Sequence, residues 1–172
     1  MPATGTIRSG RLLLTPLHVD DANDMVSVLA HPDLYSFTGG EPPTFDQLQQ
    51  RYRNQSAGSP RDDETWHNWI VRLHGSAIGF VQATVVGELA DLAWVVGHSW
   101  QGRGYGSEAA RAMRDWLAAQ GVGRFTAHIH PDHAASMAVA ARLGLEATGR
   151  LDQDGEMLWE SGHDAGRHGA NL

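Results

Sequence analysis

The sequence predicts an α+β fold, layered like an α/β protein, in which helices flank a mixed and mostly antiparallel central sheet. Three strand-like runs follow one another at 66–73, 77–86 and 89–96. Only short turns separate them, as an antiparallel meander requires. A loop with three glycines then leads into a strongly periodic helix at 105–121, after which strand and helix patterns alternate. This order of elements favours a mixed sheet with helices on its faces.

The part of the chain before these strands should hold one strand and two helices. We expect a strand at 11–17, a helix from Asp20 or Asp21 to about Leu29, and a helix from Thr44 to about Gln55. The aspartate and the threonine are placed as caps, because their side-chain oxygens can accept hydrogen bonds from the free N–H groups of a first helical turn. The loop between the two helices, 31–43, is rich in glycine and proline.

The part after the three strands should alternate between helix and strand. We expect a helix at 105–121, a strand at 124–130, a helix at 132–144 and a strand at 155–161. Glycines end both helices, as stop signals commonly do. We see no internal repeat and no linker, so we expect a single domain over 1–162 and a flexible C-terminal tail at 163–172.

The composition excludes several classes of protein. The chain has no cysteine, which excludes disulfides, thiolate metal sites and a cysteine nucleophile. No apolar run approaches the roughly 20 residues that span a bilayer, and the N-terminus lacks the pattern of a secretory signal. We therefore expect a cytoplasmic protein without a membrane partner. The formal charge of −7 disfavours nucleic acid as a ligand and is compatible with a cationic substrate such as an amine.

The segment WVVGHSWQGRGYGSEAARAM, residues 94–113, is typical of an anion-binding turn. A strand ends and a helix starts within it, with Gly102, Gly104 and Gly106 at the junction. Glycines let the backbone approach a ligand, and the free N–H groups of a first helical turn carry partial positive charge, so a pyrophosphate fits there. The chain has no lysine for a Walker motif, and the even glycine spacing does not fit the dinucleotide fingerprint. The pattern that fits is Q-x-x-G-x-G, which starts at Gln101.

With this motif, the sequence resembles the GNAT family of N-acetyltransferases over nearly its whole length, from RLLLTPL to GEMLWES. It is most similar to the branch that includes ribosomal-protein N-terminal acetyltransferases. The resemblance implies the GNAT fold, and acetyl-CoA as co-substrate. It also implies one group of residues at the cofactor's phosphates and a second whose backbone could donate to the thioester oxygen. The first group is Gln101, Gly102, Arg103, Gly104, Tyr105 and Gly106, and the second is Trp94, Val95 and Val96. Arg103 could add a charge-assisted contact or stay solvated.

The motif HIHPDH, residues 128–133, has a spacing with which some hydrolases hold two zinc ions. Such enzymes carry the motif early and add ligands from later strands, whereas little chain follows it here. The family resemblance instead places His133 at the start of a helix, where relatives usually have asparagine, and Ser136 where they have serine. We therefore expect no metal site, and we count His133 and Ser136 among the residues that bind the cofactor.

Three side chains are candidates for the base that deprotonates an amine. Asp91 is the first, because its position resembles that of a glutamate on the same strand of histone acetyltransferases, although it could simply form a salt bridge. Glu41 is the second, in a loop that resembles the family's substrate loop, although it could be an ordinary exposed turn residue. His67 titrates in a useful range, but a histidine between tryptophans is more often structural.

The general acid is less well defined. A tyrosine often protonates the CoA thiolate in this family, and the matching position here is Ala140. Either Ser136 takes this role or the thiolate leaves unassisted, which a thiol pKa near ~8.5 makes tolerable. Ser136 could also be a helix serine that bonds its own backbone.

We predict an N-acetyltransferase that moves the acetyl group of acetyl-CoA to a primary amine by direct attack. The acceptor would be a small-molecule amine or a protein N-terminus, selected by the loops at 31–43 and 54–65. A homodimer is compatible with the sequence, although no motif specifies one. Two other functions stay open. The missing tyrosine leaves room for a non-catalytic acyl-CoA sensor on the same fold, and HIHPDH leaves a zinc-dependent hydrolase as a remote alternative.

Overall fold

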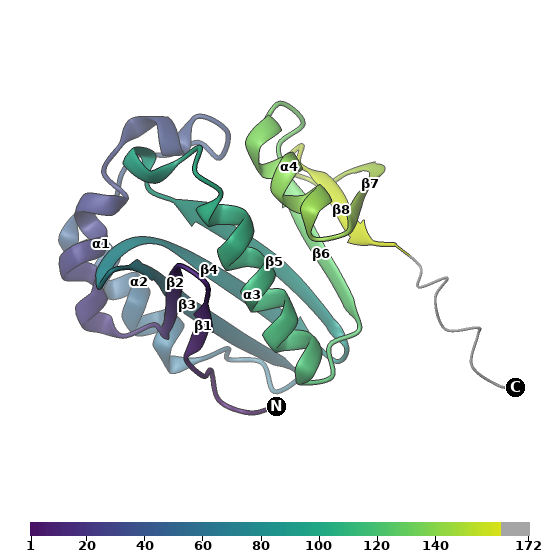
Figure 1. Cartoon of the computed structure of the whole chain (residues 1–172), viewed down its shortest axis with the longest axis horizontal. Helices are drawn as coiled ribbons and strands as arrows, with labels where there is room; N and C mark the ends of the chain where they lie inside the picture. The colour runs from purple at the N-terminus through teal and green to yellow at the C-terminus, as the bar shows by residue number, and fades with distance from the viewer. Residues whose placement is uncertain (163–172) are drawn as a thin grey trace, which may run out of the picture.

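The computed structural model describes residues 1–162, which form an eight-stranded sheet flanked by helices (Figure 1). Within this described part of the chain the strand order is β1-β2-β3-β4-β5-β6-β8-β7, and β5 and β6 are the one parallel pair. The strands are β1 (Ile7–Ser9), β2 (Leu12–Pro16), β3 (Glu64–Leu73), β4 (Ser76–Val86), β5 (Leu89–Val96), β6 (Arg124–Ile129), β7 (Leu145–Leu151) and β8 (Met157–Ser161). The predicted mixed, mostly antiparallel sheet is confirmed. The predicted flexible tail lies outside the described residues.

Helices cover the sheet on both faces. They are α1 (Ala22–Val28), α2 (Phe45–Ala57), α3 (Tyr105–Ala119) and α4 (Ala134–Arg142), with the short 3-10 helices η1 (Val19–Asp21), η2 (Pro32–Tyr35) and η3 (His98–Trp100). Side chains of α3 and α4 share one apolar core with the sheet, and those of α1 and α2 share a second core that involves β3 and β4. Within residues 1–162, no helix is long and apolar enough to cross a membrane.

The two predicted helix starts in the first half of the chain differ in outcome. Thr44 caps α2 as predicted: its hydroxyl accepts from Gln47 N at 3.2 Å, and the Gln47 side chain accepts from Thr44 N at 3.0 Å. Asp21 is the N-cap residue of α1, within the predicted pair Asp20 and Asp21, but its side chain makes no capping hydrogen bond to the helix. Because η1 precedes α1, the carboxylate of Asp21 turns back to accept from His18 N at 2.8 Å and pairs with Arg72 at 2.7 Å.

The structure holds two strands that the sequence pattern did not indicate. Strand β1 has three residues, which is too short to show an alternation of polar and apolar side chains. Strand β7 lies at the edge of the sheet, and its residues after Leu145 are mostly exposed. An edge strand with few buried side chains lacks the hydrophobic pattern on which sequence-based prediction depends.

Strands β5 and β6 pair only at their beginnings. Residues Leu89–Asp91 pair with residues 124–126, whereas β5 pairs with β4 as far as Val96. The two parallel strands therefore diverge, as their paths toward the top of Figure 1 show. Gly79 allows β4 to follow β5 to its end, because a Cβ there would lie 2.2 Å from the carbonyl oxygen of Val95. Beyond Asp91, the edge of β5 that faces β6 is left without a strand partner.

His67 lies in the core on the α3 face, where it is structural. Its side chain is 1% exposed and packs between the rings of Trp69 and Trp116. Nδ1 lies 2.8 Å from the hydroxyl of Thr4, and Nε2 is buried with no hydrogen-bond partner among residues 1–162. An imidazolium would need a partner for each N–H group, so burial lowers the pKa of His67.

We expect acid to destabilise the protein through His67. Because its folded-state pKa is lowered, the unfolded chain binds more protons, and the free energy of unfolding should fall as the pH drops below about 6.5. The slope is at most about 1.4 kcal/mol per pH unit for one proton. When urea unfolding is measured between pH 7.5 and 5, the free energy of unfolding should fall less steeply with decreasing pH in His67→Phe than in the original protein. Equal slopes would contradict this assignment.

Candidate active site

Glycines shape the junction between β5 and α3. Gly102 and Gly104 have φ values of 78° and 82°, in the left-handed region that favours glycine. Gly104 is the N-cap of α3, and no side chain caps the helix. The N–H groups of its first turn are therefore available to a ligand, and an anion is the ligand that such a terminus favours. This is the form that the sequence motif predicts.

The other residues of the predicted phosphate loop have distinct surroundings. The side chain of Gln101 donates from Nε2 to the carbonyl of Val96 at 3.0 Å and so ties the loop to the end of β5. Arg103 is exposed, so its guanidinium is accessible to a ligand. A Cβ at Gly106 would meet Val96 and Val139 at ordinary contact distances of 3.5 and 3.8 Å. The ring of Tyr105 is buried, which leaves only its backbone for a phosphate.

Arg11 supports this loop from the β1–β2 turn. Its Nε donates to Glu108 at 2.9 Å, and its Nη1 donates to the carbonyl of Arg103 at 3.1 Å. Its guanidinium also lies over the ring of Tyr105, 4.5 Å from the centroid. Sequence reasoning missed Arg11, because it precedes the loop by more than 90 residues and matches no motif.

Replacing Arg11 with glutamine should weaken the binding of acetyl-CoA about three- to tenfold. The change removes a hydrogen bond to the loop carbonyl and a charged partner of Glu108, and each such contact is worth about 1 kcal/mol. Calorimetric titration with acetyl-CoA measures the effect. Arg8→Gln is a matched control, since Arg8 lies on neighbouring β1 and makes no side-chain hydrogen bond within residues 1–162. An equal loss in both variants would contradict a specific role for Arg11.

The open edge of β5 lies beside this loop. Residues Trp94, Val95 and Val96 pair with β4 and, within residues 1–162, have no strand partner on the β6 side, although the carbonyl of Val96 accepts from the side chain of Gln101. The side chains of Trp94 and Val96 pack on the core below α3, whereas Val95 packs on the core below α1 and α2. An elongated ligand held by the loop can therefore bond to free backbone groups along β5, which is what the predicted contact to a thioester oxygen requires.

Asp91 stands where β5 and β6 separate. Its Oδ1 accepts from the hydroxyl of Thr126 at 2.8 Å and lies 3.6 Å from Nε2 of His128. Its side chain is 45% exposed, so a substrate can reach it. Partial burial raises the pKa of Asp91, Thr126 and His128 act against that rise, and Asp152 adds to it. A carboxyl group with a raised pKa beside an open strand edge is suited to proton transfer.

The loop between α1 and α2 reaches the N-terminus of α4. Phe37 in this loop stacks on His133, with the ring centroids 4.4 Å apart and the planes inclined by 12°. His133 is the N-cap of α4, and its Nε2 lies 3.4 Å from Oγ of Ser136. Burial, followed by the charge of His130, lowers the pKa of His133. The predicted cofactor residues His133 and Ser136 thus lie together at the start of α4, which follows β6, whereas Gln101 follows β5.

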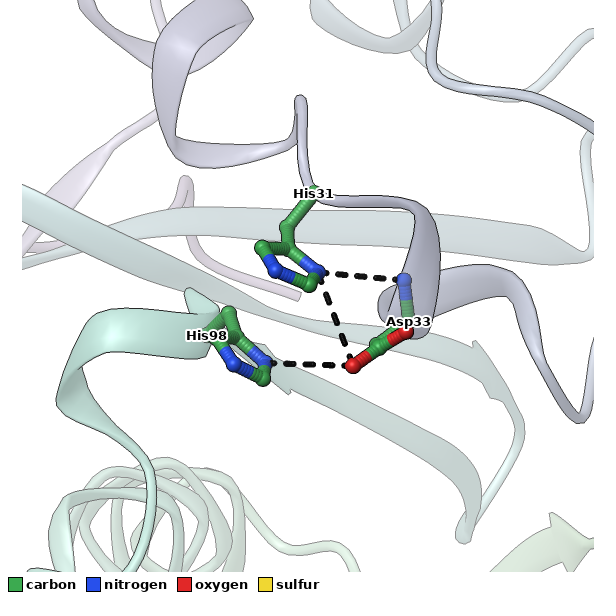
Figure 2. Close-up of side chains that lie close together, drawn as sticks. All are labelled: His31, Asp33 and His98. Carbon is green, nitrogen blue, oxygen red and sulfur yellow. Dashed lines mark hydrogen bonds and ion pairs between the residues drawn. The ribbon is translucent and has the colours of Figure 1, made fainter.

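Glu41 lies in the same loop and is exposed. It makes no side-chain hydrogen bond or ion pair with residues 1–162, so no contact joins it to Asp91. His31 and Asp33, at the start of this loop, meet His98 of η3 (Figure 2). The two imidazole rings stack at 3.7 Å, and Oδ2 of Asp33 lies 3.8 and 4.0 Å from their Nδ1 atoms. This contact fastens the loop next to the phosphate-loop junction.

Two groups of side chains in the described part of the chain could hold a metal ion by proximity. They are His31, Asp33 and His98, and the group Asp152, Asp154 and Glu156. In the first group the rings are nearly parallel, inclined by 8°, so the lone pairs of their Nδ1 atoms do not point to a common centre. Neither group contains the three histidines of HIHPDH. His128 faces Asp91 and Asp152, whereas His133 faces Phe37.

The chain is similar to known acetyltransferases. A family model described as an acetyltransferase (GNAT) domain matches residues 11–146. No sequence among curated proteins matches the chain. A GNAT-family acetyltransferase from Bacillus anthracis has 19% identity and a TM-score of 0.75, with 91% of this chain and 97% of that chain covered.

Two enzymes solved with coenzyme A share the same fold. RimL, a ribosomal L7/L12 alpha-N-protein acetyltransferase, has 15% identity and a TM-score of 0.77, over 91% of this chain and 96% of its own. The aminoglycoside acetyltransferase AAC(6')-Ib has 18% identity and a TM-score of 0.73, over 87% and 94%. At these identities the likeness concerns the fold, and both structures show that the fold can hold coenzyme A.

Proposed function

The chain belongs to the GNAT family of acetyltransferases, and on that premise we propose that it transfers the acetyl group of acetyl-CoA to a primary amine by direct attack. The observation that carries this proposal is the uncapped, glycine-shaped N-terminus of α3 beside the open edge of β5. One feature suits a pyrophosphate and the other suits an extended arm that ends in a thioester. Gly102, Gly104 and Gly106 would hold the phosphates, and Gln101 would fix their loop.

Asp91 would supply the base. An alkylamine with a pKa near ~10.4 is only about one part in two thousand free base at neutral pH, which corresponds to ~4–5 kcal/mol. Acetyl-CoA provides the thioester that the free amine attacks. Asp91 would take the proton from the ammonium, directly or through a water molecule, and backbone N–H groups of Trp94 to Val96 would stabilise the charge that develops on the thioester oxygen.

The acceptor would enter from the side of the sheet that carries α1 and α2. Asp91 shares this face with Val95, which packs below those helices. The loop with Phe37 and Glu41 borders the same region and would select the acceptor. Aminoglycosides and the N-terminus of a ribosomal protein are the acceptors that the names of two similar enzymes imply. The formal charge of −7 favours a cationic acceptor for this chain as well.

A non-catalytic acyl-CoA sensor is the second candidate. Ala140, at the position where the family often has a tyrosine acid, is fully buried in the core. The position therefore offers neither a phenol nor access to a thiolate. Catalysis would then depend on Ser136 or on unassisted departure of the thiolate.

Calorimetric titration of the purified protein with acetyl-CoA tests the cofactor, and thiol release with a panel of amines tests the reaction. The panel should include aminoglycosides, polyamines, amino acids and peptides with free N-termini. Micromolar binding followed by thiol release with any amine supports the transferase. Binding with no release across the panel favours the sensor. Absence of both binding heat and a thermal shift would refute both functions.

A further inference from the structure

A carboxylate, an imidazole and a second carboxylate form a row next to the point where β5 and β6 separate. Asp152 lies in the β7–β8 turn, His128 on β6 and Asp91 on β5. Nδ1 of His128 lies 2.9 Å from Oδ2 of Asp152, and Nε2 lies 3.6 Å from Oδ1 of Asp91. The two ring nitrogens of one histidine thus face two acidic side chains from different elements.

The turn holds Asp152 rigidly. Its Oδ1 accepts from Asp154 N and Glu156 N, both at 2.9 Å, and its own N–H donates to the carbonyl of Glu156 at 2.8 Å. These hydrogen bonds lower the pKa of Asp152, and the one from the backbone of Glu156 has the largest effect. The carboxylate is therefore ionised at neutral pH and can only accept hydrogen bonds. In its neutral form, His128 therefore donates from Nδ1 to Asp152, and its Nε2 carries the lone pair that faces Asp91.

We propose that His128, oriented by Asp152, is a positioning residue that takes the proton from Asp91 after each deprotonation of the acceptor amine and passes it to solvent. This inference rests on the proposed function, because it assigns a route to the proton that the reaction releases. The side chain of His128 is 37% exposed, so one end of the row is open to water. The arrangement repeats a familiar logic, in which a carboxylate fixes the tautomer of an imidazole that moves protons.

The proposed reaction steps conserve protons and electrons. The ammonium gives one proton to Asp91, the freed lone pair forms the N–C bond, and the C–S bond breaks with its electron pair on sulfur. The nitrogen loses its second proton to solvent as the amide forms, and the thiolate takes up one proton from solvent. Protonated Asp91 then gives the proton to Nε2 of His128, whose Nδ1 stays bonded to Asp152. The imidazolium finally loses the Nε2 proton to water or buffer, which returns both groups to their starting states.

Several acidic side chains surround His128. Its acidic neighbours are Asp91 on β5, Asp152, Asp154 and Glu156 in the β7–β8 turn, and Glu160 on β8. The second histidine near the turn is His130. Across from it on β8 is Leu158, an uncharged partner. Most of these charged groups are acidic, and Arg150 on β7 pairs with Glu160 at 3.4 Å.

The tautomer of His128 tests the arrangement without any activity measurement. In ¹⁵N-histidine-labelled protein above pH 8, we expect the Nδ1–H tautomer for His128, assigned by its loss in His128→Gln. Asp152→Asn should shift it toward Nε2–H, because an amide in place of Oδ2 no longer accepts from Nδ1. His18→Gln is the control, since His18 also lies beside a carboxylate, that of Asp20 in η1, but is not part of the row formed by Asp152, His128 and Asp91. An Nε2–H tautomer in the original protein would overturn the proposal.

The kinetic arm follows the pH dependence of turnover with the best amine of the panel. His128→Gln and Asp152→Asn should lower kcat about tenfold at pH 6.5 and leave KM for acetyl-CoA within about twofold. The acid limb of the profile should move to higher pH in His128→Gln, because His128 lowers the pKa of Asp91, and to lower pH in Asp152→Asn, because Asp152 raises it. Added imidazole should restore part of the rate to a His128→Gly variant. Profiles unchanged in both variants, together with a strong loss in Asp91→Asn, would refute the relay and leave the proposed function intact. Failure of the proposed function would appear as absence of turnover in the original protein.

Discussion

Replacing Gly104 with valine is expected to weaken the binding of acetyl-CoA at least about tenfold, because the change acts on the backbone that would hold the pyrophosphate. Gly104 caps α3 with φ at 82°, which a β-branched residue adopts only under strain. A Cβ at this position would also lie 3.4 Å from Nη2 of Arg11, the side chain that supports the loop. The strain and this contact would both turn the first N–H groups of α3 away from their present directions.

A second glycine provides a control for the strain alone. Gly121 follows α3 with φ at 98°, and a Cβ there would meet nothing within 4 Å. Gly121→Val should therefore cost a similar amount of stability, about 1–2 kcal/mol, and leave the affinity for acetyl-CoA unchanged. Thermal unfolding compares the stability of the two variants, and calorimetry compares their affinities. If Gly104→Val bound acetyl-CoA as tightly as Gly121→Val, the phosphates would have to bind elsewhere.

The elements that sequence reasoning located are those whose signals are local. The β3–β4–β5 meander has long apolar runs and short turns, and α2 begins with a threonine and a glutamine three residues apart. Each signal lies within one stretch of chain, so it can be read without knowledge of the fold. Strands β1 and β7 form by pairing with β2 and β8, and no local pattern of side chains indicates this pairing.

The same distinction holds for the candidate site. The loop from Gln101 to Gly106 was predictable because its glycines and the helix that follows are adjacent in sequence. Arg11 was not, because the fold brings the β1–β2 turn against α3. The spacing of HIHPDH suggested zinc ligands, and nothing in it indicated the role that we propose for its first histidine. His128 meets Asp152 only because β7 and β8 fold back beside β6.

Asp91→Asn is expected to lower turnover about 100-fold at pH 7 while changing the affinity for acetyl-CoA less than twofold. Asparagine keeps an oxygen that can accept from Thr126, so the end of the β5–β6 pairing should stay in place. It cannot take a proton. Since partial burial raises the pKa of Asp91, the original enzyme should lose activity as the pH falls through that raised value and the carboxylate is protonated.

The pH dependence of the loss identifies the base. Without a base, only amine that is already neutral reacts, and that fraction rises about tenfold per pH unit below the pKa of the amine. The deficit of Asp91→Asn should therefore be largest at low pH and shrink as the pH rises. Asp115→Asn, which changes an exposed carboxylate on α3 paired with Arg114, controls for the loss of one negative charge. A deficit that is the same at every pH would mean that Asp91 orients the acceptor without taking its proton. If Asp91→Asn turned over as fast as Asp115→Asn, Asp91 would have no part in the mechanism, and Glu41 or solvent would be the base.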